Sequence, residues 1–203
     1  MLVANRQKYT ESICIGADGF CFTLPDGHRS IAVRSPYTAI PYCRNCDNDP
    51  QIAGSIFHAI FASDRGLVIR IEHIEPLQTD IVFGVTGELE NIVSEKYPEA
   101  EVHSHIYSFL AEEYGKGTLS AVWQDEEYGF DIFAIRNGQL LLLNAIRMND
   151  PYKIAYYILK VWKEVDFRTG ENEIRLYGFG EGPVSTVIRN LKLMTGDNTV
   201  CVL

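Results

Sequence analysis

The sequence predicts an α/β protein made of two half-domains, each with the element order β-β-β-α-β-α-β along the chain. The clearest observation lies in the second half, where three short strands within 118–146 are joined by tight turns and followed by a helix from Asp150. A strand ending at Tyr177, a second helix and a last strand over 200–203 complete the order. The first half shows the same order with one added strand, so the architecture repeats although the residues do not.

The composition is that of a globular protein with a core of its own. The chain has 203 residues, enough for one large domain or two small ones. Its formal net charge is -9 and no dense Lys/Arg block stands out, so we expect no nucleic-acid partner. The longest apolar run, 140–143, is far too short to span a bilayer, and we expect no membrane insertion.

The first residues and the cysteines indicate the cytoplasm. Residues 1–10 are polar and lack the apolar stretch of a signal peptide. The five cysteines are an odd number in a mid-sized chain, which fits a reducing compartment where disulfides are rare. Cys14, Cys21 and Cys201 fall in strand-like segments, where we expect each to be a small buried apolar residue.

The first half begins with short strands separated by turns. Asp18-Gly19 is typical of a hairpin turn between the first two strands. Residues 35–49 are expected to form a loop because they include two prolines and two cysteines. Three strands precede this loop, over 12–15, 20–24 and 31–33.

Three helices and further strands complete the first half. Asp49 is expected to cap a helix that begins at Pro50. A second helix, capped by Thr86, runs to residue 97, and a third covers 106–114. The first helix has an apolar face at helical spacing, formed by Ile52, Ile56, Phe57, Ile60 and Phe61. The expected strands lie over 67–71, 81–85 and 101–103.

The helix after Asp150 has the strongest periodicity in the chain. Pro151 is its expected first residue, and Tyr156 and Lys160 lie away from the apolar side. Aromatic residues in such a stripe usually bury area, so we expect this helix to pack on a sheet. The stripe consists of Ile154, Tyr157, Ile158, Val161 and Trp162.

Several segments resemble a bacterial family of unknown function that is assigned to the actin-like ATPase fold. The resemblance covers nearly the whole chain, and the order of elements carries most of it. It implies two ribonuclease-H-like subdomains, 1–116 and 117–203, related in fold to acetate and sugar kinases, heat-shock-cognate proteins, actin and pilus-type actin-like proteins. The segments that carry it are the hairpin 12–22, the stretch 130–140, residues 144–147, the helix 150–159 with its paired tyrosines, and the strand 174–178.

An actin-like ATPase needs two phosphate loops of the type Asp-x-Gly-(Thr/Ser). The carboxylate orders magnesium, and the glycine lets backbone N–H groups approach the phosphates. In the first loop, 16–19, a glycine stands where the Asp belongs and no hydroxyl follows. Asp18 could take that place, although Asp18-Gly19 is equally a plain hairpin turn.

The remaining nucleotide positions are also poor in the required residues. The second loop, 123–129, holds three adjacent carboxylates that would repel a triphosphate unless metal screened them, and is typical of a solvated turn. A third position keeps Gly178 and Gly180 before a helix, which can seat a phosphate or ribose or form an ordinary connection. If a nucleotide binds, we expect contacts from Asp18, Gly19, Gly178 and Gly180.

Two further clusters contain the residue types of metal or redox sites. Cys43 and Cys46 have the Cys-x-x-Cys spacing, but no second such pair supplies the four ligands of a structural zinc. They also lack the helix start that lowers a thiol pKa, which disfavours a redox pair. His103 and His105 are expected on one face of a strand, where a structural pair is the commoner arrangement.

The sequence favours a non-catalytic actin-like scaffold or protein-interaction module with degenerate nucleotide loops, without a catalytic residue or cofactor. A protein partner or a homodimer is expected, through the edge of the last strand or the strand over 67–71. The alternative is a divergent ATPase or phosphotransferase that binds ATP and magnesium. A zinc-stabilised module at Cys43 and Cys46 is a weaker alternative.

Overall fold

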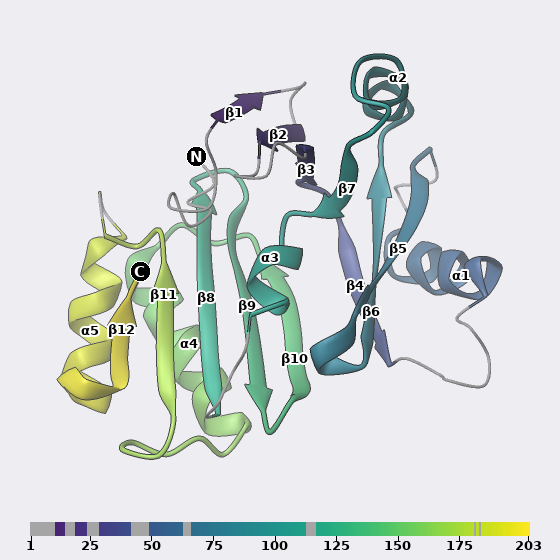
Figure 1. The fold of residues 1–203 in the computed structure, drawn as a ribbon. Helices are drawn as coiled ribbons and strands as arrows, with labels where there is room; N and C mark the ends of the chain where they lie inside the picture. Colours follow the sequence, from purple (N-terminus) through teal and green to yellow (C-terminus); the bar gives the residue numbers. More distant parts are fainter. Residues whose placement is uncertain are drawn as a thin grey trace. The chain divides into compact units, whose positions relative to one another are not determined.

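The structure is a computed structural model that describes residues 11–14, 19–23, 29–41, 49–62, 66–112, 117–180, 182 and 184–203. The described chain divides into two compact units (Figure 1), an amino-terminal unit that ends at Glu112 and a carboxy-terminal unit that includes the residues from Gly117. The sequence had placed this division between residues 116 and 117.

The amino-terminal unit contains a four-stranded sheet in the order β1-β2-β3-β7. The first three strands form an antiparallel meander, and β7 lies parallel to β3. A short helix, α3, follows β7, where the backbone N–H of His105 donates to the carbonyl of Val33 at 2.9 Å. The elements are β1 (Glu11–Cys14), β2 (Gly19–Thr23), β3 (Arg29–Val33), β7 (Glu101–Ser104) and α3 (Tyr107–Leu110).

The same unit holds a three-stranded antiparallel sheet in the order β4-β6-β5. Its strand β4 lies within 35–49, so the prediction of a loop over that whole segment was wrong. Proline is tolerated at an edge strand, and β4, which ends at Pro41, is an edge of this sheet. The elements are β4 (Tyr37–Pro41), α1 (Pro50–Ile60), β5 (Val68–Ile74), the 3-10 turn η1 (Glu75–Leu77), β6 (Thr79–Val85) and α2 (Gly87–Lys96).

The predicted helix starts are confirmed by their caps. The Asp49 carboxylate accepts from the backbone N–H of Gln51 at 2.8 Å, and the Thr86 hydroxyl accepts from that of Leu89 at 3.3 Å. The third predicted helix, 106–114, is much shorter than expected, since α3 covers only Tyr107–Leu110.

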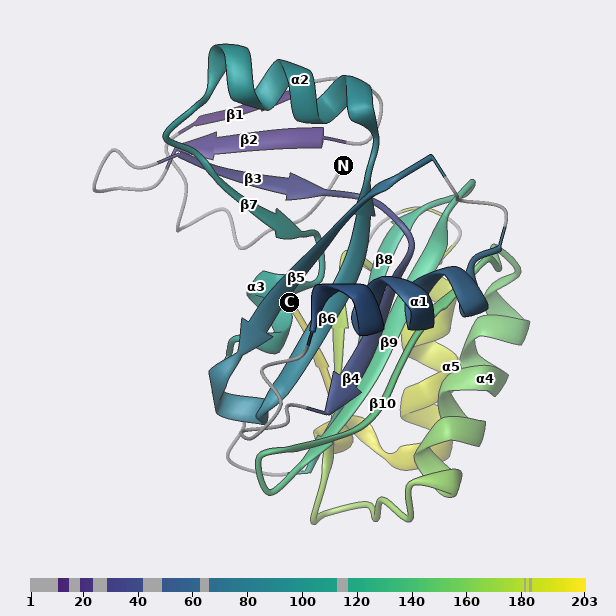
Figure 2. The same cartoon turned by 90° about the vertical axis from the view of Figure 1, so that its right-hand side faces the viewer.

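Helix α1 covers one face of the three-stranded sheet (Figure 2). Ala53 and Phe57 are buried there against Val82. The predicted apolar face was only partly correct, because Ile52 and Ile60 are 59% and 55% exposed. The helix carries apolar residues around most of its circumference, so periodicity alone did not identify the buried side.

The carboxy-terminal unit has a five-stranded sheet in the order β10-β9-β8-β11-β12. Its meander is antiparallel, and the first strand, β8, pairs in parallel with β11. Each unit has a three-stranded meander with one parallel neighbour, but that neighbour pairs with the first strand of the meander here and with the third strand in the amino-terminal unit. The element orders also differ, because in the amino-terminal unit β4 precedes α1 and two strands follow it. The elements are β8 (Thr118–Asp125), β9 (Gly129–Arg136), β10 (Gln139–Ile146), α4 (Pro151–Glu164), β11 (Glu173–Tyr177), α5 (Ser185–Thr195), η2 (Asp197–Thr199) and β12 (Val200–Val202).

Helices α4 and α5 contribute to one core with the sheet of this unit. The Asp150 carboxylate caps α4 by accepting from the N–H groups of Tyr152 and Lys153, as predicted. The predicted α4 stripe is confirmed, while Tyr156 is exposed. The central buried residues of this core include Leu119, Phe130, Ile132, Ile154, Ile158, Leu176, Phe179 and Leu191.

Two further observations bear on the sequence predictions. Cys201 is exposed on β12, so its assignment as a buried apolar residue was wrong; short β12 is an edge strand and leaves that side chain uncovered. The side chains of Cys14 and Cys21 lie outside the described residues. None of the described helices is both long and apolar enough to cross a membrane.

Candidate functional site

The two nucleotide positions of the carboxy-terminal unit lie at the same edge of its sheet. Strands β8 and β11 run in parallel, with Val122 opposite Tyr177. The turns that follow their carboxyl ends are therefore neighbours, at the edge where α/β sheets usually bind ligands. These are the β8–β9 turn, 125–129, and the β11–α5 connection, 178–184.

The β8–β9 turn is closed by its own first residue. One carboxylate oxygen of Asp125, Oδ1, accepts hydrogen bonds from the backbone N–H groups of Glu127, at 2.9 Å, and Tyr128, at 2.8 Å. This is an Asx-type turn, in which an aspartate side chain takes the donors of the residues after it. A phosphate loop presents such N–H groups to the ligand, and here a carboxylate of the protein occupies them.

The charge around this turn is also unfavourable for a phosphate. Glu126 and Glu127 are exposed and extend the negative charge of Asp125. On the neighbouring strands, Asp131 is buried and accepts a 2.7 Å hydrogen bond from Nε2 of Gln124. Four carboxyl groups therefore lie in or beside the turn, and an incoming anion would be repelled.

The β11–α5 connection is filled by an aromatic side chain. Phe179 is fully buried, and its ring centroid lies 5.9 Å from that of Trp123 and 6.4 Å from that of Phe130. Gly178 adopts a positive φ of 76° and donates its N–H to the carbonyl of Leu203 at 3.4 Å. The N–H of Gly178 is therefore already bonded within the protein at this point.

Gly180, another predicted contact, has open space around it. A Cβ placed on Gly180 would meet no heavy atom within 4 Å. Helix α5 begins shortly afterwards, and its cap residue, Val184, makes no side-chain capping hydrogen bond. The backbone near Gly180 is therefore approachable, which keeps this residue as a predicted contact.

The remaining predicted site residues are only partly described. Gly19 begins β2 and pairs with Val33. Asp18, Cys43 and Cys46 lie outside the described residues, so their predicted roles stay predictions. Within the described ranges, no group of three or more His, Cys, Asp or Glu could hold a metal ion.

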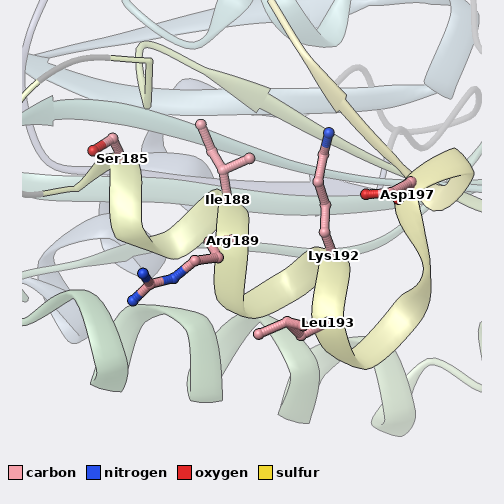
Figure 3. A pocket seen from close by; sticks show the side chains of 6 residues that line it. All are labelled: Ser185, Ile188, Arg189, Lys192, Leu193 and Asp197. Atoms are coloured by element: carbon pink, nitrogen blue, oxygen red, sulfur yellow. The ribbon is translucent and has the colours of Figure 1, made fainter.

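A shallow depression of about 410 Å³ runs along α5 (Figure 3). Two of its lining residues, Arg189 and Lys192, are basic, and Leu193 is 77% exposed. The depression mixes basic and apolar groups from one helix and the turn after it. Its lining residues are Ser185, Ile188, Arg189, Lys192, Leu193 and Asp197.

The most developed polar cluster lies in the amino-terminal unit and is centred on Glu72 of β5. The Glu72 carboxylate accepts from the backbone N–H of Ser104 at 3.1 Å, from its hydroxyl at 2.6 Å and from Nδ1 of His103 at 3.1 Å. Nε2 of His103 lies 3.3 Å from Glu101, and the imidazole stacks on Tyr107 with 4.2 Å between centroids.

The same contacts shift the titration of His103. Burial lowers the pKa of this imidazole, but the hydrogen bonds and charges of Glu72 and Glu101 outweigh burial and hold the pKa above its ordinary value of 6.5. The hydroxyl of Ser104 donates to the Glu72 carboxylate rather than to an imidazole, which is not the arrangement of a nucleophile and its base. The cluster joins strand β5 of one sheet to strand β7 of the other.

Sequence reasoning missed the roles of Asp125 and Glu72. The first had a usable signal, because an aspartate at the start of a four-residue turn commonly binds the following N–H groups. The second had none, since Glu72 and Ser104 are 32 positions apart and meet only through the packing of β5 beside β7.

Comparisons with known proteins support the fold. A family model described as "Protein of unknown function (DUF3822)" matches residues 49–191. A crystal structure from Bacteroides thetaiotaomicron, described as a protein with actin-like ATPase fold and unknown function, is similar with a TM-score of 0.71 and 20% identity, covering 100% of this chain and 94% of that one. The chain therefore has an actin-like ATPase fold, as the sequence predicted. The comparison with curated proteins finds no significant match.

Proposed function

Because this chain belongs to the DUF3822 family of proteins of unknown function and has an actin-like ATPase fold, we propose that it is a non-catalytic actin-like module that binds a protein partner. The observation that carries the proposal is the occupancy of the β8–β9 turn. Its N–H groups at Glu127 and Tyr128 are bound by the Asp125 carboxylate. We propose the cytoplasm as its compartment, on the cysteine content of the sequence.

The proposal is supported by a second feature of the same sheet edge. Phe179 is fully buried in the connection where an actin-like ATPase would place its nucleoside. Burial of a phenylalanine stabilises the folded state by about 2–3 kcal/mol, so this side chain is held in place by the core. A nucleotide would have to displace both an internal carboxylate and a core aromatic residue.

The direct test is the thermal midpoint of the protein with and without Mg-ATP or Mg-ADP. A ligand at one hundred times its dissociation constant stabilises by about 2.7 kcal/mol, which for a protein of this size is a rise of about 5–10 °C. We expect no rise with either nucleotide. A rise of several degrees would contradict the proposal.

A divergent nucleotide-binding ATPase or phosphotransferase is the second candidate, favoured by the open space at Gly180. It would use Asp18, Gly19, Gly178 and Gly180 with ATP and magnesium. It predicts a measurable hydrolysis rate that is lost in Asp18→Asn. Wild-type protein that does not hydrolyse ATP, or a rate indifferent to this substitution, would reject it.

The zinc-stabilised module at Cys43 and Cys46 is tested by metal analysis. Elemental analysis of protein purified without chelators should give one zinc per chain if the module exists, and this should fall in Cys43→Ser. A metal content far below one per chain would reject it.

A further inference from the structure

The two long helices of the carboxy-terminal unit collect positive charge in an acidic chain. Helices α4 and α5 lie side by side over one face of their sheet (Figure 2). Their 14 and 11 residues hold five of the 18 Lys and Arg residues and one of the 27 Asp and Glu residues, Glu164. Five positive charges less one negative charge give +4. Because the whole chain carries -9, the residues outside these helices carry -13.

The lysines of α4 lie on the side of the helix opposite its core. Lys153 and Lys160 are seven residues apart, and Tyr152, Tyr156 and Lys163 follow each other at spacings of four and seven residues. These spacings return to the same side of a helix. All five side chains are exposed, while the apolar stripe of α4 is in the core.

Most of this charge is not neutralised within the protein. Lys160 lies 3.8 Å from Glu164, and both side chains are more than half exposed, so their pair contributes little to stability. Among the residues that the structure describes, no ion pair involves Lys153, Lys163 or Lys192. An acidic ligand would therefore meet cations that are available to it.

Helix α5 adds apolar groups to the same surface. Arg189 and Leu193 extend from α5 on the side nearer α4, and Ile188 and Lys192 extend from the other side (Figure 3). These four residues line the depression of about 410 Å³ along α5, where Leu193 is 77% exposed. Of its described lining residues, Asp197 alone is acidic, and it lies beyond the end of the helix. The depression therefore offers cations and apolar contacts together.

We infer that the outer surface of α4 and α5 binds an acidic segment of a partner protein that also carries apolar side chains. This partner chemistry rests on the proposed function, which it makes more specific. Carboxylates of the segment complement the positive charge of the helices, and its apolar side chains supply the buried contact in the depression. The residues proposed to contact the segment are Lys153, Lys160, Lys163, Arg189, Lys192 and Leu193.

Two other polyanions that bind basic surfaces fit this one less well. A nucleic acid or an anionic membrane would bring many phosphates toward a chain that carries -13 outside these helices, and would be repelled there. A short protein segment confines its charge to the basic surface. The apolar stripes of α4 and α5 are also held in the core, so neither helix can enter lipid as an amphipathic helix does.

Calorimetric titration of the full chain with a synthetic peptide tests the inference. The peptide has about 14 residues, with about two Glu for each Leu, and a peptide of Glu alone is the comparison. In about 50 mM NaCl the Glu–Leu peptide should bind with a dissociation constant of about 10–100 µM, and at least about fivefold more weakly in about 300 mM NaCl. The Glu peptide should bind at least about threefold more weakly than the Glu–Leu peptide. No binding at about 1 mM Glu–Leu peptide, or equal binding of the two peptides, would overturn the inference.

Two lysines in matched positions locate the contact. Lys192 and Lys96 each lie in the last turn of a helix, α5 and α2, and substitution of either by Glu changes the net charge from -9 to -11. Lys192→Glu should weaken binding of the Glu–Leu peptide at least about tenfold, and Lys96→Glu should stay within about twofold of wild type. Lys153→Glu, on the exposed side of α4, should weaken it at least about fivefold and serves if Lys192→Glu does not fold. Equal losses at residues 192 and 96 would contradict this surface.

Titrations with vesicles containing about 30% phosphatidylserine and with single-stranded DNA of about 14 nucleotides test the kind of partner. The Glu–Leu peptide should bind more tightly than either at the same salt. Tighter binding of vesicles or DNA that is lost in Lys192→Glu would overturn the choice of a protein segment. Failure of every probe, with no thermal rise in Mg-ATP, would remove this surface and leave the proposed function, whereas a rise in Mg-ATP would remove the proposed function itself.

Discussion

The Glu72 carboxylate oxygen Oε1 accepts from both the hydroxyl of Ser104, at 2.6 Å, and its backbone N–H, at 3.1 Å. Glu72 lies on β5 and Ser104 ends β7, so one nearly buried carboxylate fastens the three-stranded sheet to the four-stranded sheet. With Nδ1 of His103, the carboxylate takes three donors from the end of β7.

Glu72→Ala should destabilise the protein by about 2–4 kcal/mol, because the Ser104 donors and His103 lose their acceptor in a nearly buried place. Chemical denaturation monitored by circular dichroism measures the loss. Glu75→Ala, which removes an exposed carboxylate on the neighbouring turn, is the control and should change stability by less than about 0.5 kcal/mol. Equal effects of the two substitutions would contradict the role given to Glu72.

The contribution of His103 to stability should depend on pH. Its folded pKa lies above the ordinary value of about 6.5, so its protonated form is favoured by folding. The stabilisation is fully present below pH 6.5 and is lost as pH rises through the raised pKa. The stability difference between wild type and His103→Gln should therefore be largest near pH 5.5 and shrink toward alkaline pH. A difference that grows with pH would show that the pKa is lowered instead.

Arg136 at the end of β9 should stabilise the end of α4. Its guanidinium donates from Nη2 to the carbonyls of Val165 and, at 3.0 Å, Asp166, and lies 4.8 Å from the centroid of the Phe167 ring. Arg136→Ala should cost about 1–3 kcal/mol, since it removes two hydrogen bonds and a cation–π contact.

Arg136→Lys should recover only part of that stability, because an ammonium can donate to both carbonyls from one nitrogen, as Nη2 does, but lacks the planar guanidinium that lies over the Phe167 ring. Arg189→Ala on α5 removes an exposed arginine and serves as the control, with an expected change within about 0.5 kcal/mol. Full recovery by lysine would mean that charge alone matters at residue 136. All three variants are compared by urea denaturation.

Substitution by alanine should reduce stability strongly at one glycine of the candidate nucleotide edge and only slightly at another. Gly129 has a φ of 78°, and a Cβ there would lie 2.1 Å from the carbonyl oxygen of Ile146, so Gly129→Ala should cost about 3 kcal/mol or more. Gly180→Ala has open space and should stay within about 1 kcal/mol of wild type. Thermal unfolding of both variants checks this, and a severe loss in Gly180→Ala would show that the site is tighter than described.

The sequence predicted those parts of the fold in which local and long-range preferences agree. In α4, the cap at Asp150, the proline at Pro151 and the apolar stripe all indicate the same helix and the same buried side. In α1 the cap was equally clear, yet the outward Ile52 and Ile60 removed the contrast that identifies a buried face. The sequence pattern of α1 therefore predicted a helix without identifying its buried side.

Strand β4 and the two meanders show a different limit. Pro36 and Pro41 indicate a loop from the chain alone, and only the position of β4 at a sheet edge makes Pro41 acceptable. The first and third strands of a meander run in the same direction, so element order does not decide which of them receives the parallel neighbour. For the candidate site, the sequence predicted that the second loop lacks the residues of a phosphate loop. It did not predict that Asp125 closes this loop by binding its N–H groups.

The closed turn at Asp125 determines which substitution has to come first if this sheet edge is to bind a phosphate. The Asp125 carboxylate lies two and three residues before the N–H groups that it binds, so its effective concentration there is far above that of a dissolved anion. A hydroxyl or a lysine added elsewhere on this edge would leave these two N–H groups occupied while the tethered carboxylate remains. A form of this edge that binds a phosphate through these N–H groups would therefore have to begin with the replacement of Asp125, at a cost in the stability of the hairpin.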